Sequence, residues 1–260
     1  MYLGLIAYLR ELLCRGNTKV IENIIEAGLY PSICKMSTAL EYEDLMVEIT
    51  WVLTNLTSTE DLQIMDFMLD EQYGLVKYLG SMIKHPNLKV KEHALWWFAN
   101  LMEGSQDHYE KLLKTSYINE WMSIMNEDKI KLSLLRVVSW GLSNLMKYKN
   151  KSTELIQTCI EMLSTIIFIS DSEATPDCAH AFKNITDVEE ENEETYKFKL
   201  KCLGESWVVH KLVDIVMNND KCSVPALRAV GNISSSNDPI CDRQIVESDW
   251  FSKCKYPVIY

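Results

Sequence analysis

The chain alternates between apolar stretches and short polar segments, and five of the apolar stretches share one internal pattern. In each of them a Trp, His or Arg is followed four positions later by Asn, in a largely apolar setting. Residues at positions i and i+4 lie on the same face of a helix, so the pattern predicts five helices that each carry a pair of such side chains. The five stretches are residues 51–56, 96–101, 140–145, 180–185 and 228–233.

The five Asn residues follow one another at nearly regular intervals. They are Asn55, Asn100, Asn144, Asn184 and Asn232, which lie 45, 44, 40 and 48 residues apart. Self-similarity at this period is typical of armadillo and HEAT repeats. We call the five pairs the ladder, and its members are Trp51 and Asn55, Trp96 and Asn100, Trp140 and Asn144, His180 and Asn184, and Arg228 and Asn232.

A weaker pattern precedes some of these stretches, where an apolar segment runs into a turn, as in residues 24–31, 112–117 and 245–250. Gly28 suits the position that ends a helix, and Pro31 suits the first turn of the next one. Each repeat is therefore predicted to hold three helices. We predict an all-α fold, a right-handed superhelical solenoid formed by a single armadillo-repeat array over residues 1–260, with partial repeats at both ends.

Composition and charge narrow the classes of ligand and site that the protein could have. The net charge of −11 and the pI near 5.0 disfavour a nucleic-acid partner and favour a cationic one. The eight Cys are dispersed, without metal-ligand spacing, and are expected to be reduced, mostly buried thiols of an intracellular protein. The sequence contains no apolar run long enough to span a membrane and no known catalytic motif. We therefore expect no membrane association, no metal, no cofactor and no enzymatic activity.

Stacked repeats would bring the ladder residues into one row. Asn side chains can donate to and accept from the main chain of an extended peptide, which holds the peptide without reading its sequence. Neighbouring indole faces form slots for the stems of Lys or Arg, and each cation–π contact contributes roughly 0.5–2 kcal/mol. The ladder thus predicts a basic peptide as the ligand, with Trp and Asn side chains that lie outside the core.

The remaining Trp residues and an acidic segment have simpler interpretations. For any single Trp in a helix the alternative is a packing role. We assign to the core or to packing between repeats the four Trp that lack the Asn partner, namely Trp97, Trp121, Trp207 and Trp250. The acidic run between Asp187 and Glu194 is expected to be a solvated loop, or else a source of long-range attraction for a basic ligand.

Several of these segments resemble the importin alpha family, the adaptors that carry nuclear localisation signals. The resemblance rests on residues 10–15, 23–31, 51–55, 140–145 and 225–233, and the last of these shares with the family an Arg where neighbouring repeats have Trp. It implies an armadillo fold, basic cargo proteins as partners and a location in the cytoplasm and the nucleus. The alternative is an armadillo-type interaction scaffold without transport activity.

The resemblance also implies which residues contact cargo. Trp51, Asn55, Trp96, Asn100, Trp140 and Asn144 correspond to the major cargo groove. Glu173 and Asp177 fall where the family keeps acids that face cargo cations, and Asn184, Arg228 and Asn232 complete the expected set of peptide-binding residues.

The sequence departs from the family pattern in three places. Gly104 stands where the family has Asp, with Glu103 one position earlier, and His180 replaces a Trp. The printed chain has no Arg- and Lys-rich segment before its first repeat, so binding to importin beta is not expected. It ends within a sixth repeat, so the family's later Trp and Asn pairs are not expected to contribute.

Overall fold

The structure is a computed structural model of the chain. It describes residues 2–15, 18–36, 42–70, 75–115, 117–127, 129–149, 151–187, 192–218 and 221–248. Every regular element in this part of the chain is a helix, as predicted. The chain divides into two compact units, residues 1–141 and 142–260, and each is described by itself.

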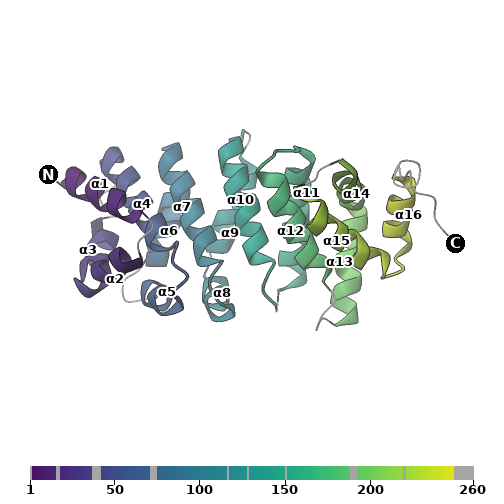
Figure 1. Ribbon diagram of the computed structural model, residues 1–260, viewed down its shortest axis with the longest axis horizontal. Coiled ribbons are helices and arrows are strands. Elements are labelled where there is room, and N and C mark those ends of the chain that lie inside the picture. Colours follow the sequence, from purple (N-terminus) through teal and green to yellow (C-terminus); the bar gives the residue numbers. More distant parts are fainter. Residues whose placement is uncertain are drawn as a thin grey trace. The chain divides into compact units, whose positions relative to one another are not determined.

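The first unit contains the helices that carry the first two ladder pairs (Figure 1). They are α1 (Tyr2–Leu13), α2 (Thr18–Glu26), α3 (Leu29–Met36), α4 (Glu43–Leu56), α5 (Leu62–Met68), α6 (Leu75–Ile83), α7 (Leu88–Leu101), α8 (Gln106–Leu113), α9 (Tyr117–Met122) and the 3₁₀-helix η2 (Ser123–Asn126). The next helix, α10 (Leu132–Leu145), contains the boundary between the units.

The second unit continues the helical pattern. Its helices are α11 (Thr153–Phe168), α12 (Ala174–Thr186), α13 (Glu193–Glu205), α14 (Val208–Asn218), α15 (Ser223–Ser234) and α16 (Pro239–Glu247). Within it α12 packs against both α11 and α15, and α15 packs against α14 and α16.

Local chemistry explains where many helices begin and end. The side chains of Asp61, Asn87 and Asn192 accept hydrogen bonds from backbone N–H groups in the first turn of α5, α7 and α13. Gly28 has φ of 63°, in the left-handed region that ends α2, and Pro31 lies in the first turn of α3, as predicted.

The prediction of three helices in every repeat is wrong for the repeat between the ladder residues Asn144 and Asn184. The described residues between Leu145 and Ala174 form one long helix, α11, of 16 residues where other repeats have two shorter ones. This repeat also has the shortest interval between ladder Asn residues, because the segment of one helix is missing. The longest interval, from Asn184 to Asn232, accommodates both α13 and α14.

The Trp residues without an Asn partner do not all lie in the core. Trp97 and Trp121 are fully buried, as predicted. The prediction is wrong for Trp207, which is 56% exposed and occupies the turn between α13 and α14 with φ of 58°. Trp250 lies outside the described residues.

The cysteine thiols follow the prediction closely. Six of the seven described Cys are buried and only Cys14 is exposed, while Cys254 lies outside the described residues. Burial raises the pKa of Cys34 and Cys159 to about 12, so these thiols stay protonated and unreactive near neutral pH.

The acidic run is not a continuous loop. Asp187 is exposed directly after α12, and residues 188–191 lie outside the described residues. Glu193 and Glu194 are the first residues of α13, so the loop prediction is wrong for them. Carboxylates at this end of a helix are favourable, because the helix dipole is positive there. No helix in the described part of the chain is long and apolar enough to cross a membrane.

Candidate peptide-binding site

Each ladder pair lies near the C-terminal end of its helix. The five helices are α4, α7, α10, α12 and α15. In the first unit α4 packs between α1 and α7, and the three run side by side (Figure 1). Consecutive ladder residues of this unit are therefore brought close together, as the repeat predicts.

Trp51 is 37% exposed and contacts groups from both neighbouring helices. The guanidinium carbon of Arg10, on α1, lies 4.5 Å from the centroid of the indole. The imidazole of His93, on α7, has its centroid 5.1 Å from that of the indole. Arg10 Nε also donates to Glu48 Oε2 at 2.6 Å, and this bond raises the pKa of Arg10 further above its ordinary value. An indole and a carboxylate thus hold a guanidinium, the group that a basic peptide would bring.

Trp96 and Trp140 are in direct contact, which the sequence did not predict. Their ring centroids are 5.8 Å apart and the rings are tilted by 46°. A methylene stem between parallel rings needs about 7–8 Å, twice the usual carbon–carbon contact distance. The expected open slot is therefore closed between these two rings. Trp96 is 47% exposed, so nearly half of its side chain is open to the solvent.

Two of the five ladder Asn residues are buried, and two of the five are hydrogen-bonded to the preceding ladder helix or the residue directly after it. The amide of Asn100 donates to Thr54 O at 3.0 Å and to Thr57 Oγ1 at 3.2 Å, both on or just after α4. Asn232 donates in the same manner to Thr186 Oγ1 at 3.4 Å. Asn100 and Asn144 are 5% and 2% exposed, so the expectation that they lie outside the core is wrong. A role for them in peptide binding stays a prediction.

This geometry predicts a stability cost for Asn100→Ala. Two buried hydrogen bonds are lost and the hydroxyl of Thr57 loses a partner, so the free energy of unfolding should fall by about 1–3 kcal/mol. Asn55→Ala is the matched control, because Asn55 is only half-buried and donates to the weak acceptor Cys14 Sγ. Urea denaturation of both variants measures the difference. Equal losses of unfolding free energy in the two variants would show that the hydrogen bonds of Asn100 add no stability beyond that of the Asn55 bond.

Arg10 and Cys14 form a pair that resembles the ladder pairs and that the sequence pattern did not reveal. Arg10 and Cys14 have the spacing of the other pairs, and Cys14 lies 41 residues before Asn55, to which it is hydrogen-bonded. Arg10 lies at the same separation from Trp51. A search that allowed residues other than Asn in the second position would have found this pair one repeat before the first Trp.

The space around Gly104 is filled by neighbouring side chains. A side chain at this position would begin 2.4 Å from His108 Nδ1 and 2.6 Å from the sulfur of Met65. His108 is buried, accepts from the Ser105 N–H at 3.2 Å and contacts Asp66 at 3.1 Å. Because His108 occupies this space, an Asp at position 104 would require the imidazole to move.

In the second unit two lysines act on the ladder residue His180. Burial lowers the pKa of His180, and Lys183 and Lys147 lower it further. Arg228 is exposed on α15. Glu173 precedes α12 and Asp177 lies in its first turn, about 10 Å along the helix axis from Asn184. The predicted acids therefore lie toward the opposite end of α12 from the ladder Asn.

The buried His93 predicts a pH-dependent stability. Burial lowers the pKa of His93 below its ordinary value of 6.5, so the unfolded chain takes up the proton more readily than the folded one. The free energy of unfolding should therefore fall as the pH drops below 6.5. Urea denaturation between about pH 7.5 and 5.5 should show this loss in the wild type and a smaller loss in His93→Gln. Parallel pH curves for the two proteins would contradict the prediction.

Comparison with known sequences supports the resemblance. No family model matches the chain. The chain is 28% identical over 232 residues to importin subunit alpha-1b of Oryza sativa subsp. japonica, which covers 88% of this chain and 41% of that protein. It is 25% identical over 235 residues to importin subunit alpha-2 of Caenorhabditis elegans, covering 89% and 42%. The predicted resemblance to importin alpha is confirmed, and the chain spans about two fifths of the length of these curated relatives.

Solved structures confirm the fold. A designed armadillo repeat protein in complex with the peptide (KR)4 matches with a TM-score of 0.72 and 18% identity, over 89% of this chain and 91% of that one. An engineered protein matches with a TM-score of 0.77 and 19% identity, over 95% of this chain and 57% of that one. The chain has the fold of an armadillo-repeat solenoid.

Proposed function

We propose that this armadillo-repeat chain, which resembles importin alpha subunits, binds basic nuclear localisation signals in extended form as an adaptor for protein import into the nucleus. The function is binding, not catalysis. Trp51, Trp96 and Trp140 would hold the cationic side chains, and the polar groups beside them would hold the peptide main chain. The chain would then act in the cytoplasm and the nucleus.

The contact between Arg10 and Trp51 carries this proposal. A guanidinium on an indole face, with a carboxylate at 2.6 Å, is the arrangement that an arginine of the ligand would need. Arg10 and Glu48 are only 18% and 19% exposed, so water screens this pair less than it would a surface pair. The relatives named importin subunit alpha and the solved complex of an armadillo protein with (KR)4 favour the same class of ligand.

Fluorescence anisotropy with a labelled (KR)4 peptide tests the proposal. We expect saturable one-to-one binding that weakens by roughly tenfold or more between 0.05 and 0.5 M salt, because salt screens the opposite charges of peptide and protein. The control is a peptide of the same length with Gln at every position, which should not bind. Equal binding of both peptides, or binding of neither, would exclude a basic ligand.

Transport requires a separate measurement. Because the chain itself is not expected to bind importin beta, the assay uses the chain fused to a segment that binds this carrier. If the chain is an import adaptor, the fusion should concentrate a fluorescent cargo with a basic signal in the nuclei of permeabilised cells supplied with importin beta. Peptide binding without nuclear accumulation would support the scaffold alternative for this segment.

A further inference from the structure

The cation site at Trp51 is filled by a side chain of the protein itself. The guanidinium carbon of Arg10 lies 4.5 Å from the centroid of the indole, and Arg10 Nε donates to Glu48 Oε2 at 2.6 Å. Glu48 and Trp51 lie three positions apart on α4, so they belong to one face of that helix. Two groups of α4 thus form a site for a guanidinium, and the neighbouring helix α1 supplies its occupant.

The other neighbour of the indole is held in place. The imidazole of His93, on α7, has its centroid 5.1 Å from that of the Trp51 indole. Its Nδ1 lies 3.2 Å from the hydroxyl oxygen of Thr50, which is fully buried. The position of Arg10 is therefore the place where a ligand cation would meet both the indole and the carboxylate of Glu48.

A ligand cation has to displace Arg10 in order to bind there. It gains the contacts with Trp51 and Glu48 only as Arg10 loses them, so an exchange of like for like adds little to the affinity. Arg10 is tethered to the site, and its local concentration does not depend on the concentration of peptide. Arg10 and Glu48 are 18% and 19% exposed, so salt screens their attraction less than that of a surface pair. Arg10 is therefore a persistent competitor.

The exchange is balanced for an arginine of the ligand and unfavourable for a lysine. A guanidinium is planar, stacks on an aromatic face and carries its N–H donors in a fixed fork. It can contact the indole and the carboxylate at the same time, as Arg10 does. The ammonium group of lysine is a compact, strongly hydrated charge without a planar face. A lysine that displaced Arg10 would leave part of the lost contacts unreplaced.

We propose that Arg10 competes with the peptide for Trp51 and thereby makes this position of the ladder selective for arginine over lysine. The inference rests on the proposed peptide-binding function, to which it adds the residue that sets the specificity at one position. Its consequence is opposite to that of an ordinary contact residue, because removal of Arg10 should strengthen binding.

Fluorescence anisotropy with labelled (KR)4 tests the competition. Arg10→Ala should lower the Kd at least about tenfold, because the ligand no longer has to displace a tethered cation. Trp51→Ala should raise the Kd of the wild type less than about threefold, and in the Arg10→Ala background it should abolish the gain in affinity. Circular dichroism checks the folding of each variant. Arg10→Lys should lower the Kd in the same direction at unchanged charge, and it tests the competition even if Arg10→Ala does not fold.

Arg243→Ala is the matched control. Arg243 lies on α16, outside the ladder, is 74% exposed and donates from Nε to Glu247 Oε1 at 2.7 Å. Its substitution therefore removes the same charge and releases a carboxylate, as Arg10→Ala does. Since an exposed ion pair contributes little, the Kd for (KR)4 should change by less than about twofold.

Peptides of eight arginines and of eight lysines test the selectivity. The wild type should prefer the arginine peptide, and Arg10→Ala should reduce that preference, because a lysine can then reach Trp51 without displacing a guanidinium. The inference is wrong if the wild type binds (KR)4 but Arg10→Ala binds it no more tightly than Arg243→Ala, if the gain survives Trp51→Ala, or if the preference for arginine is unchanged. If neither the wild type nor Arg10→Ala binds (KR)4, the peptide-binding function itself is wrong, and this inference fails with it.

Discussion

Trp121→Ala should lower the free energy of unfolding by about 3–5 kcal/mol, which is the usual cost of replacing a buried Trp or Phe with Ala. The side chain is fully buried, packs against Phe98 at 6.0 Å between ring centroids and donates its Nε1 to Leu95 O at 3.3 Å. A Cβ added at Gly141 would lie only 2.4 Å from Cζ2 of this indole. The substitution therefore leaves a cavity between α7, α9 and α10 that rigid helices cannot close.

Trp207→Ala provides the control for this prediction. It removes the same side chain from a position that is 56% exposed, so the stability should change by less than about 0.5 kcal/mol. Urea denaturation followed by circular dichroism measures both variants. Binding of (KR)4 per folded molecule should be unchanged in Trp121→Ala. A loss of stability equal to that of Trp207→Ala would show that the packing around Trp121 is loose.

The sequence predicted the parts of this molecule that depend on local spacing. The pairs four residues apart are all on helices, because the i, i+4 relation that defines the pattern is itself helical geometry. Gly28 and Pro31 marked the turn between α2 and α3 for equally local reasons. The same reasoning could not separate Trp121 from Trp207, since lacking an Asn four positions later does not determine burial. Trp207 is exposed because it lies in a turn.

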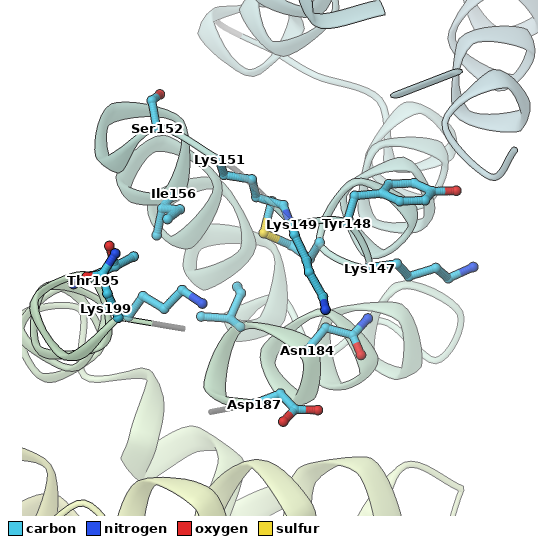
Figure 2. Close-up of a pocket in the computed structure, with 13 residues that line it drawn as sticks. Lys147, Tyr148, Lys149, Lys151, Ser152, Ile156, Asn184, Asp187, Thr195 and Lys199 are labelled. Carbon is cyan, nitrogen blue, oxygen red and sulfur yellow. Dashed lines mark hydrogen bonds between the residues drawn. The ribbon is translucent and has the colours of Figure 1, made fainter. Parts of the chain in front are cut away.

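The features that the sequence did not predict depend on contacts between repeats. Nothing local in the sequence shows that the amide of Asn100 reaches Thr54, 46 residues earlier, or that Arg10 covers Trp51. The cavity shown in Figure 2 is a further example, because its lining combines residues that follow α10 with residues of α11, α12 and α13.

Replacing Trp96 or Trp140 with Ala should have a large effect on the affinity for the peptide. If the proposed function is correct, each Trp→Ala substitution removes one wall of a cation slot and should weaken (KR)4 binding by about 2 kcal/mol or more, which is at least about thirtyfold in Kd. Trp96 is 47% exposed, so Trp96→Ala removes little core packing and the helical circular dichroism should stay near that of the wild type. Trp207→Ala should leave the affinity unchanged, because this exposed indole is not in the ladder.

The contact between the two indoles makes a further test possible. Their centroids are 5.8 Å apart, so they must separate before a lysine or arginine stem can enter between them. One slot with two walls fails when either wall is removed, so the double variant should lose less affinity than the two single losses added together. Strictly additive losses would indicate two independent contacts in place of one slot. If both single variants unfold while (KR)4 binding by the wild type is absent or indifferent to salt, the two tryptophans are packing residues and the peptide-binding proposal is wrong.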